Sequence, residues 1–219
     1  MSDTYHQRIK QEKRTAVLDA ATALFLEQGY DRTSLAQVAG QAGVSTATLF
    51  KRFPTKAALL QAIVQAFWEA DDPGQGFAPA GNPRTGLRRI GRDYVRRMRR
   101  PGMAGIYRLV IAEAPRFPEL GRVLAEQGMG ACVAGLTAYL EAETAAGTLA
   151  VPDAARAARQ FLAVIAGQAF WPELLVPGCA GSEADADAAV DQAVALMLAR
   201  YVRKPAPGGA ALPAKIRAE

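Results

Sequence analysis

The stretch TSLAQVAGQAGVSTATLFKRFPTK, residues 33–56, carries the start and stop signals of two short helices in succession. Ser34 stands three positions before Gln37, a spacing typical of a capping box, so a helix is expected to begin here. Gly43 interrupts that helix, and Ser45 begins a second one that must end before the following proline. Two short helices joined by a turn that contains glycine indicate a helix-turn-helix.

Helical patterns continue on both sides of this stretch. An amphipathic helix is expected over residues 9–28, with Gly29 as its C-terminal cap residue. Thr55 is expected to cap a fourth helix, whose apolar stripe extends to Trp68. The Gly- and Pro-rich residues 71–83 predict a boundary loop.

The remainder also follows the helical period, and no stretch indicates a strand, so the predicted fold is all-α with about nine helices. Asn82 and Pro83 are expected to cap and begin the next helix. Further helices are expected over residues 83–100, 102–114, 118–146, 153–174 and 183–203. The expected parts are a DNA-binding domain at 9–70 with its helix-turn-helix at about 33–53, a larger helical domain at 83–203, and flexible tails at 1–8 and 205–219.

Composition limits the function classes. The 219 residues are 50% hydrophobic and 21% charged, which is enough apolar surface for a proper core. The only histidine, His6, lies in the polar start of the chain, so we expect no metal site, no His-based catalysis and no cofactor. Two cysteines without motif spacing are typical of a reduced, cytoplasmic protein. No apolar run reaches about 18 residues, and the start resembles no signal peptide.

Positive charge is concentrated in one predicted helix. Residues 84–100 hold eight arginines against one aspartate, whereas the chain as a whole carries a net charge of +5. Arg88, Arg92, Arg96 and Arg100 recur at every fourth position and therefore share one face. A solvated face is the simple interpretation, and attraction to DNA or to an anionic ligand are the alternatives.

The second short helix has the side chains that DNA recognition needs. Small hydroxyl residues at its start, Ser45, Thr46 and Thr48, can approach base edges in the major groove. Lys51, Arg52 and Lys56 follow and can reach phosphates. Thr33 and Ser34, at the start of the first short helix, and Thr55 lie where backbone N–H groups bind phosphate oxygens.

At these residues the chain resembles the TetR family of bacterial transcription regulators. The resemblance extends over residues 9–70 and rests on many spaced positions: Ala20-Ala21-x-x-Leu24-Phe25, Gly29-Tyr30, Thr33-Ser34-Leu35-Ala36-Gln37-Val38-Ala39, and Ala42-Gly43-Val44-Ser45-x-x-Thr48-Leu49-Phe50-x-x-Phe53-x-x-Lys56. It implies that Ser45, Thr46 and Thr48 contact bases and that Lys56 contacts a phosphate. Phe50 stands where the family most often has tyrosine, and it keeps the ring for DNA-backbone contact but lacks the hydroxyl.

The motif Arg108-Leu109-x-x-x-Glu113-Ala114-x-Arg116-Phe117-Pro118-Glu119-Leu120 is similar to the C-terminal domain of the AefR-like branch of that family. The similarity implies a helical domain that binds an effector and forms a homodimer through its last two long helices. Val190, Val194, Met197, Leu198 and Tyr201 make an apolar stripe for this bundle. Ala184, Ala188, Ala195 and Ala199 permit close approach of helices.

Several side chains of this domain are candidates for lining an effector cavity, with a plain core role as the alternative for each. Glu113 could pair with a cationic ligand or simply with Arg116. The candidates are Tyr94, Met98, Tyr107, Glu113, Phe117, Cys132, Phe161 and Trp171.

The sequence therefore predicts a dimeric, sequence-specific DNA-binding regulator, most simply a repressor that a small-molecule effector releases from a palindromic operator. Coupling between the domains is expected to pass through the fourth helix. The alternatives are an activator and a helical small-molecule-binding protein without DNA affinity. An enzyme is disfavoured because titratable groups do not converge, and a DNA-packaging protein because the chain is too weakly basic.

Overall fold

The computed structural model describes residues 2–68 and 79–202, with side chains from residue 7 onward. These residues form helices joined by short turns, and the β-pairing among them is one isolated antiparallel bridge between Leu149 and Val202. The predicted all-α class is therefore confirmed. Among the described helices, none combines the length and the apolar character that crossing a membrane requires.

The N-terminal part contains four helices, α1 (Ser2–Gln28), α2 (Leu35–Gln41), α3 (Thr46–Arg52) and α4 (Lys56–Trp68). Their capping signals act as predicted. The side chains of Ser34 and Gln37 form a capping box at α2, and the Ser45 hydroxyl accepts the Thr48 N–H at the start of α3. Gly29 adopts a φ of +88° after α1, a backbone conformation that other residues rarely adopt.

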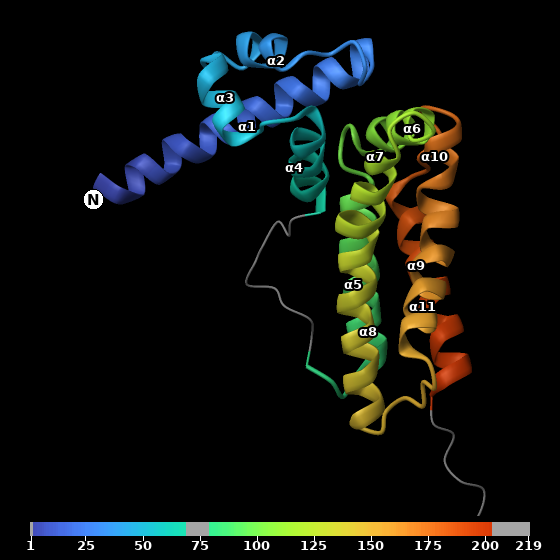
Figure 1. Ribbon diagram of the computed structural model, residues 1–219. Coiled ribbons are helices and arrows are strands. Elements are labelled where there is room, and N and C mark those ends of the chain that lie inside the picture. Colours follow the sequence, from blue (N-terminus) through green and yellow to red (C-terminus); the bar gives the residue numbers. More distant parts are fainter. Residues whose placement is uncertain (1, 69–78, 203–219) are drawn as a thin grey trace, which may run out of the picture.

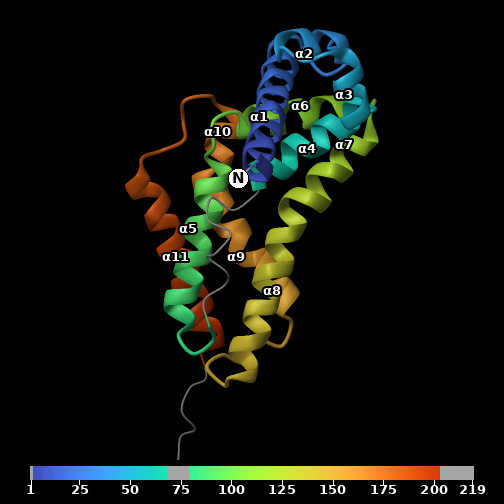
Figure 2. The same ribbon diagram turned by 90° about the vertical axis from the view of Figure 1, so that its left-hand side faces the viewer.

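The larger C-terminal part is a bundle of long helices with shorter helices at one end. Figure 1 shows α6, α7 and α10 at the end of the bundle that faces α1 and α4, and Figure 2 shows α1, α2 and α3 beyond that end. Its elements are α5 (Pro83–Met98), α6 (Met103–Glu113), α7 (Pro118–Val123), the π-helix η1 (Leu124–Met129), α8 (Gly130–Ala145), α9 (Ala154–Ala169), α10 (Trp171–Leu175) and α11 (Glu183–Tyr201).

Three helix boundaries differ from the prediction. Helix α1 begins at Ser2, so residues 2–8 of the expected tail are helical, and an Arg8–Glu12 ion pair one turn apart supports them. The single helix expected at 118–146 contains the π-helical turn η1. The helix expected at 153–174 breaks at Phe170, because the ring of Pro172 prevents the helix from continuing. The tail predicted at 205–219 lies outside the described residues.

The two parts share one hydrophobic core. Phe25 of α1 is fully buried, and Leu59, Leu60 and Ile63 of α4 are at most 2% exposed. Helix α1 also contacts α6 directly, and a Cβ on Gly105 would come within 2.8 Å of the Leu26 side chain. Helix α4 is therefore one of several contacts between the parts.

The arginine-rich helix α5 faces an acidic helix rather than solvent alone. Arg88 pairs with Asp191 at 2.7 Å, and Arg92 donates two hydrogen bonds to Asp187 on α11. At the other end of α5, Arg100 donates to the carbonyl oxygens of the last turn of α4. These contacts use part of the arginine charge to hold α5 against α11 and the α5–α6 turn against α4.

Candidate functional site

Helix α3 is fixed from one side and exposed on the other. Leu49 and Phe53 are 1% and 7% exposed and attach the helix to the core. Thr46 and Lys51 are exposed, and Phe50 is 46% exposed, which is unusual for a large aromatic side chain. An exposed helix face of this kind, on a rigid base, has the shape that enters a major groove.

The hydroxyl groups at the start of α3 organise one another. The Ser45 hydroxyl accepts the Thr48 N–H at 3.2 Å and lies 2.7 Å from the Thr48 hydroxyl. Both residues and Thr46 are exposed. The cap therefore holds Ser45 and Thr48 in fixed rotamers on the surface, and Thr46 stands beside them with no cap contact to restrain it.

Basic side chains flank α3. Lys51 and Arg52 are exposed in its last turn, and an Arg52 Nη atom approaches the Lys10 carbonyl oxygen of α1 at 3.4 Å. That contact places the basic N-terminal half of α1 beside the end of α3. Lys51 and Arg52 therefore add positive charge at the exposed face, and Arg52 links the end of α3 to the α1 backbone.

Two predicted DNA contacts have other roles here. Thr33 is only 2% exposed, and its hydroxyl donates to the carbonyl oxygens of Gly29 and Leu24 at 2.8 and 3.3 Å. The Thr33 side chain is therefore buried against the end of α1 and supplies no contact of its own, whereas the expected phosphate contact of the backbone N–H groups at this helix start stays a prediction. Ser34 is exposed, but its hydroxyl is engaged with Gln37 at 2.8 Å.

Lys56 braces the loop between α1 and α2. Its ammonium donates to the carbonyl oxygens of Tyr30 and Asp31 at 2.7 and 2.8 Å and lies 4.7 Å from the centre of the Tyr30 ring. Two of its three N–H donors therefore have protein acceptors. Thr55 caps α4 by accepting the Ala58 N–H at 3.0 Å.

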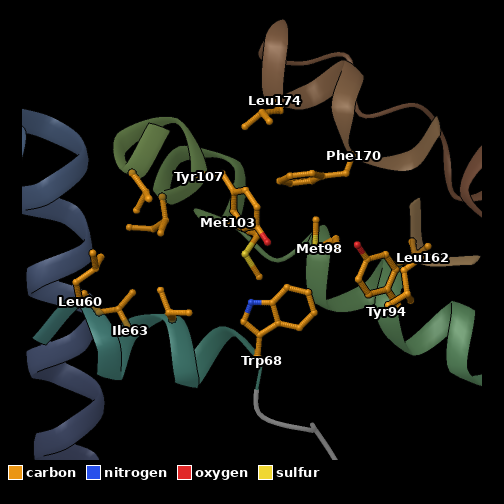
Figure 3. Close-up of a cluster of buried hydrophobic side chains, with 14 of the residues drawn as sticks. Leu60, Ile63, Trp68, Tyr94, Met98, Met103, Tyr107, Leu162, Phe170 and Leu174 are labelled. Atoms are coloured by element: carbon orange, nitrogen blue, oxygen red, sulfur yellow. The ribbon is translucent and has the colours of Figure 1, made fainter. Parts of the chain in front are cut away.

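A buried group of aromatic and methionine side chains, which we call the Trp68 cluster, lies where the end of α4 meets the C-terminal part. Figure 3 shows it between α4, α5, α6 and the end of α9. The Trp68 and Tyr94 rings lie 5.9 Å apart, and the Tyr107 and Phe170 rings 5.0 Å apart. Its members, all at most 8% exposed, are Trp68, Tyr94, Met98, Met103, Tyr107 and Phe170.

The Trp68 cluster brings together four of the predicted effector residues, if its neighbour Cys132 is included. Burial raises the pKa of Tyr107 to about 12 and the pKa of the Cys132 thiol to about 11. Burial likewise raises the pKa of Tyr94. These groups therefore stay protonated near neutral pH and can act as neutral hydrogen-bond donors.

The other four candidates lie elsewhere. Phe161 is 1% exposed and packs where α9 meets α5. Phe117 contacts the Tyr30 ring edge-on at 5.2 Å, and Glu113 lies 3.9 Å from Arg116, so both belong to the contact between the two parts of the chain. Trp171 is 51% exposed and lines no interior space.

Sequence reasoning missed Trp68 as a candidate, because its place in the α4 stripe indicated only a core role. It also missed an open pocket of about 490 Å³ where α1 meets the α5–α6 turn and α10. Of the predicted effector residues, Met98 alone reaches this pocket. The lining includes Leu26, Met98, Arg99, Gly102, Arg108, Phe170 and Glu173.

The outer face of α11 differs from the expected apolar stripe. Val190, Val194 and Met197 are at most 5% exposed because they pack inside their own subunit. The exposed apolar positions of α11 are the alanines 184, 188, 195 and 199, with Leu196 at 58% exposure, and charged residues such as Glu183, Asp187 and Asp191 are exposed on the same helix. Close to this helix in the fold, α9 and α10 expose Ala163, Gly167 and Trp171.

Comparison with known proteins assigns both parts of the chain to regulator families. Residues 17–63 match the family model for bacterial regulatory proteins of the tetR family. Residues 85–203 match the model for the C-terminal domain of AefR-like transcriptional repressors. The second match alone covers more than half of the chain.

Curated relatives and solved structures agree with this assignment. A helix-turn-helix-type transcriptional regulator of Mycobacterium tuberculosis is 34% identical over 116 residues, which is 52% of this chain and 54% of that protein. The match therefore spans about half the length of that relative. The flavonoid-responsive regulator FrrA is 30% identical with a TM-score of 0.69 over 88% of this chain and 98% of that one. A TetR regulator from Agrobacterium tumefaciens is 25% identical with a TM-score of 0.69 over 87% and 94% of the chains.

Proposed function

This chain belongs to the TetR family of bacterial transcriptional regulators, and we propose that it acts in the cytoplasm as a dimeric, sequence-specific DNA-binding repressor that a small organic effector releases from its operator. The observation that carries the proposal is the exposed face of α3. Leu49 and Phe53 anchor this helix in the core. Its opposite side presents Thr46, Phe50 and Lys51 to solvent, where they can contact a DNA duplex.

We assign the contacts on DNA by reach and chemistry. Ser45, Thr46 and Thr48 face the base edges, since small hydroxyl side chains at the start of a recognition helix can approach them closely. Phe50 packs on the sugar–phosphate backbone. Lys51 and Arg52 neutralise phosphates, and Lys56 positions the α1–α2 loop, with one N–H left for a phosphate.

A homodimer follows from the geometry of operators. Two recognition helices related by a two-fold axis must lie about 34 Å apart to enter successive major grooves. The outer faces of α9 and α11 supply an apolar surface of small residues on which a second copy can pack closely. Leu196 of α11 and, on the adjoining α10, Trp171 and Leu175 are large exposed apolar side chains in this region.

An effector is proposed from the family and from the Trp68 cluster. FrrA, a structural relative of this chain, is by its name responsive to flavonoids, which are aromatic molecules. An effector that binds next to Trp68 touches the last residue of α4. The first residue of the same helix, Lys56, holds the α1–α2 loop of the DNA-binding part. It can change operator affinity only by its different affinities for the two conformations.

The proposal is tested by selecting bound sequences from a randomised duplex library with the purified full chain. An inverted-repeat motif is expected, with binding that weakens as salt rises. Thr46→Ala should change the preferred bases more than the overall affinity. No enrichment of any motif, or an unchanged motif with Thr46→Ala, contradicts the assignment.

The phosphate contacts are separated by a matched pair of lysine variants. Lys51→Ala should lower affinity for all sequences alike and reduce the slope of log affinity against log salt by about one. Lys56→Ala should change that slope less and should lower the thermal stability of the protein, because two backbone carbonyls lose their donor. If Lys56→Ala reduced the salt slope more than Lys51→Ala does, Lys56 would be the residue that contacts the phosphate.

A further inference from the structure

Three buried hydrogen-bond donors near the Trp68 cluster have no partner among the described residues. They are Nε1 of Trp68, Nε of Arg97 and the hydroxyl of Tyr107. Trp68 and Tyr107 are 6% and 8% exposed, so water does not solvate them freely. Buried polar groups almost always have a partner, and three donors without one in the same region indicate a missing acceptor.

The donors come from three helices that meet at one place. Trp68 is the last residue of α4, Arg97 belongs to α5, and Tyr107 belongs to α6. Arg97 also donates to the carbonyl oxygen of Trp68, which ties the first two helices together. In Figure 3 the Tyr107 hydroxyl points toward the indole of Trp68, with the Met103 side chain between them.

The surroundings of the donors are apolar and uncharged overall. Aromatic rings of Trp68, Tyr94 and Phe170 line the region, and such rings favour stacking or edge contacts with another aromatic ring. The guanidinium of Arg97 is already neutralised by Asp93, with Nη2 and Oδ2 2.5 Å apart. An additional negative charge would therefore find little compensation here.

Space for a ligand comes from flexible side chains. Met98 and Met103 occupy the middle of the cluster, and unbranched methionine side chains repack at low cost. The indole itself packs closely against Gly128 of η1, where a Cβ would lie 2.7 Å from Trp68 Nε1. A π-helical turn at this position is a feature often found at functional sites.

We propose that the Trp68 cluster binds a neutral, planar aromatic ketone, whose carbonyl oxygen accepts hydrogen bonds from Trp68 Nε1 and the Tyr107 hydroxyl. A carbonyl oxygen has two lone pairs and can satisfy both donors at once. The ring system replaces the methionine side chains between Trp68, Tyr94 and Phe170. As a statement about the effector, this inference rests on the proposed function, although the binding itself does not require DNA.

The test is isothermal titration of the full chain, without DNA, with pairs of rigid molecules that differ in one group. The pairs are 1-indanone and indane, 9-fluorenone and fluorene, and xanthone and xanthene. At least one ketone should bind about tenfold more tightly than its hydrocarbon, which corresponds to about 1.4 kcal/mol. Equal affinity within every pair, or no binding of any of the six, overturns the proposal.

Conservative variants identify the donors. Trp68→Phe and Tyr107→Phe should each reduce the preference for the ketone severalfold, while binding of the hydrocarbon stays within about twofold. Tyr139→Phe removes a buried hydroxyl that bonds Glu143 instead, so it should lower stability and leave the preference unchanged. A preference that survives both Trp68→Phe and Tyr107→Phe overturns the assignment of donors.

Two further measurements complete the test. In the Trp171→Phe variant Trp68 is the only tryptophan, so bound 9-fluorenone should quench or shift its emission, and unchanged emission on binding contradicts the site. The carboxylate 2-naphthoate should bind less tightly than the ketone 2-acetonaphthone, and the reverse order contradicts a neutral ligand. Binding of a ketone to a chain that selects no DNA motif refutes the proposed function alone, whereas a selected motif without ketone preference refutes this inference alone.

Discussion

Arg116, in the turn after α6, forms an ion pair with Asp31 of the α1–α2 loop, with Nη2 and Oδ2 3.1 Å apart. The next residue, Phe117, packs its ring edge-on against Tyr30 at 5.2 Å. Lys56 binds the carbonyl oxygens of the same two loop residues. The loop between α1 and α2 is therefore held both by the C-terminal part and by α4. Coupling between the two parts of the chain thus has a route besides α4.

The ion pair and the ring contact should contribute differently to stability. Both charged side chains are about half exposed or more, so Arg116→Gln should lower the free energy of unfolding by less than about 1 kcal/mol. Phe117→Ala removes apolar packing and should cost about 2 kcal/mol. Urea unfolding followed by circular dichroism measures both. A larger loss from Arg116→Gln than from Phe117→Ala would assign the contact to the charges.

Phe50 offers a test that separates DNA contact from folding. Its ring is 46% exposed, so Phe50→Tyr should leave thermal stability unchanged. The added hydroxyl can donate to a phosphate, and operator affinity should rise by up to about fivefold, the size of one hydrogen bond of about 1 kcal/mol. Phe50→Ala should lower operator affinity at unchanged stability. A stability loss with Phe50→Ala and no change in affinity would mean that the ring serves the fold.

Local signals predicted several helix starts well. Ser34, Ser45, Thr55 and Asn82 each cap the helix that the sequence assigned to them, since a cap depends on residues only three positions away. The break at Phe170 was also signalled by Pro172, but the apolar pattern continues past it and indicated a single helix.

Tertiary roles were not predictable in the same way. The sequence around Thr33 is the same whether its hydroxyl faces DNA or the end of α1. Only the folded structure shows that this side chain is buried. Val190 and Val194 form the same apolar stripe whether they pack inside their own subunit or against a second one. The sequence does not distinguish these two arrangements, and the structure shows both residues buried within the subunit. The π-helical turn η1, which contacts α4, likewise had no signal that we recognised in the sequence.

Glu143 should make the stability of the fold depend on pH. Its carboxylate is fully buried and accepts hydrogen bonds from the Tyr139 hydroxyl at 2.5 Å, from the Gly81 N–H at 3.0 Å and from Thr148. Burial alone would raise the pKa of Glu143, but these donors outweigh it and hold the pKa below the ordinary 4.5. Ionised Glu143 therefore stabilises the fold above the unfolded-state pKa, and the contribution is lost as pH falls through the lower folded-state pKa.

Glu143→Gln should accordingly cost about 1–3 kcal/mol at pH 7, because an amide N–H₂ then faces other donors. The difference from the parent chain should shrink as the pH is lowered from 5 toward 3. Urea unfolding at a series of pH values measures it, with the exposed neighbour Glu141→Gln as control. A difference that stays constant over this pH range would show that the charge of Glu143 is not its source.

Gly128 and Gly121 form a matched pair for the contact between α4 and the long helix that contains η1. A methyl group on Gly128 would lie 2.7 Å from Trp68 Nε1 and 3.3 Å from Cε2, so the indole must shift. On Gly121 the nearest atom is the Ala114 Cβ at 3.7 Å, an ordinary contact. Gly128→Ala should therefore cost about 1–3 kcal/mol from overpacking, whereas Gly121→Ala should be neutral or slightly stabilising, since alanine favours helix.

The two substitutions should also differ in what they do to Trp68. In the Trp171→Phe background, Gly128→Ala should shift the emission of Trp68, and Gly121→Ala should leave it unchanged. Because Trp68 ends α4, a displaced indole should also alter operator affinity in the absence of any ligand. A shifted emission with unchanged operator affinity would show that the end of α4 moves without reaching α3, and coupling would then depend on the Asp31–Arg116 contact instead.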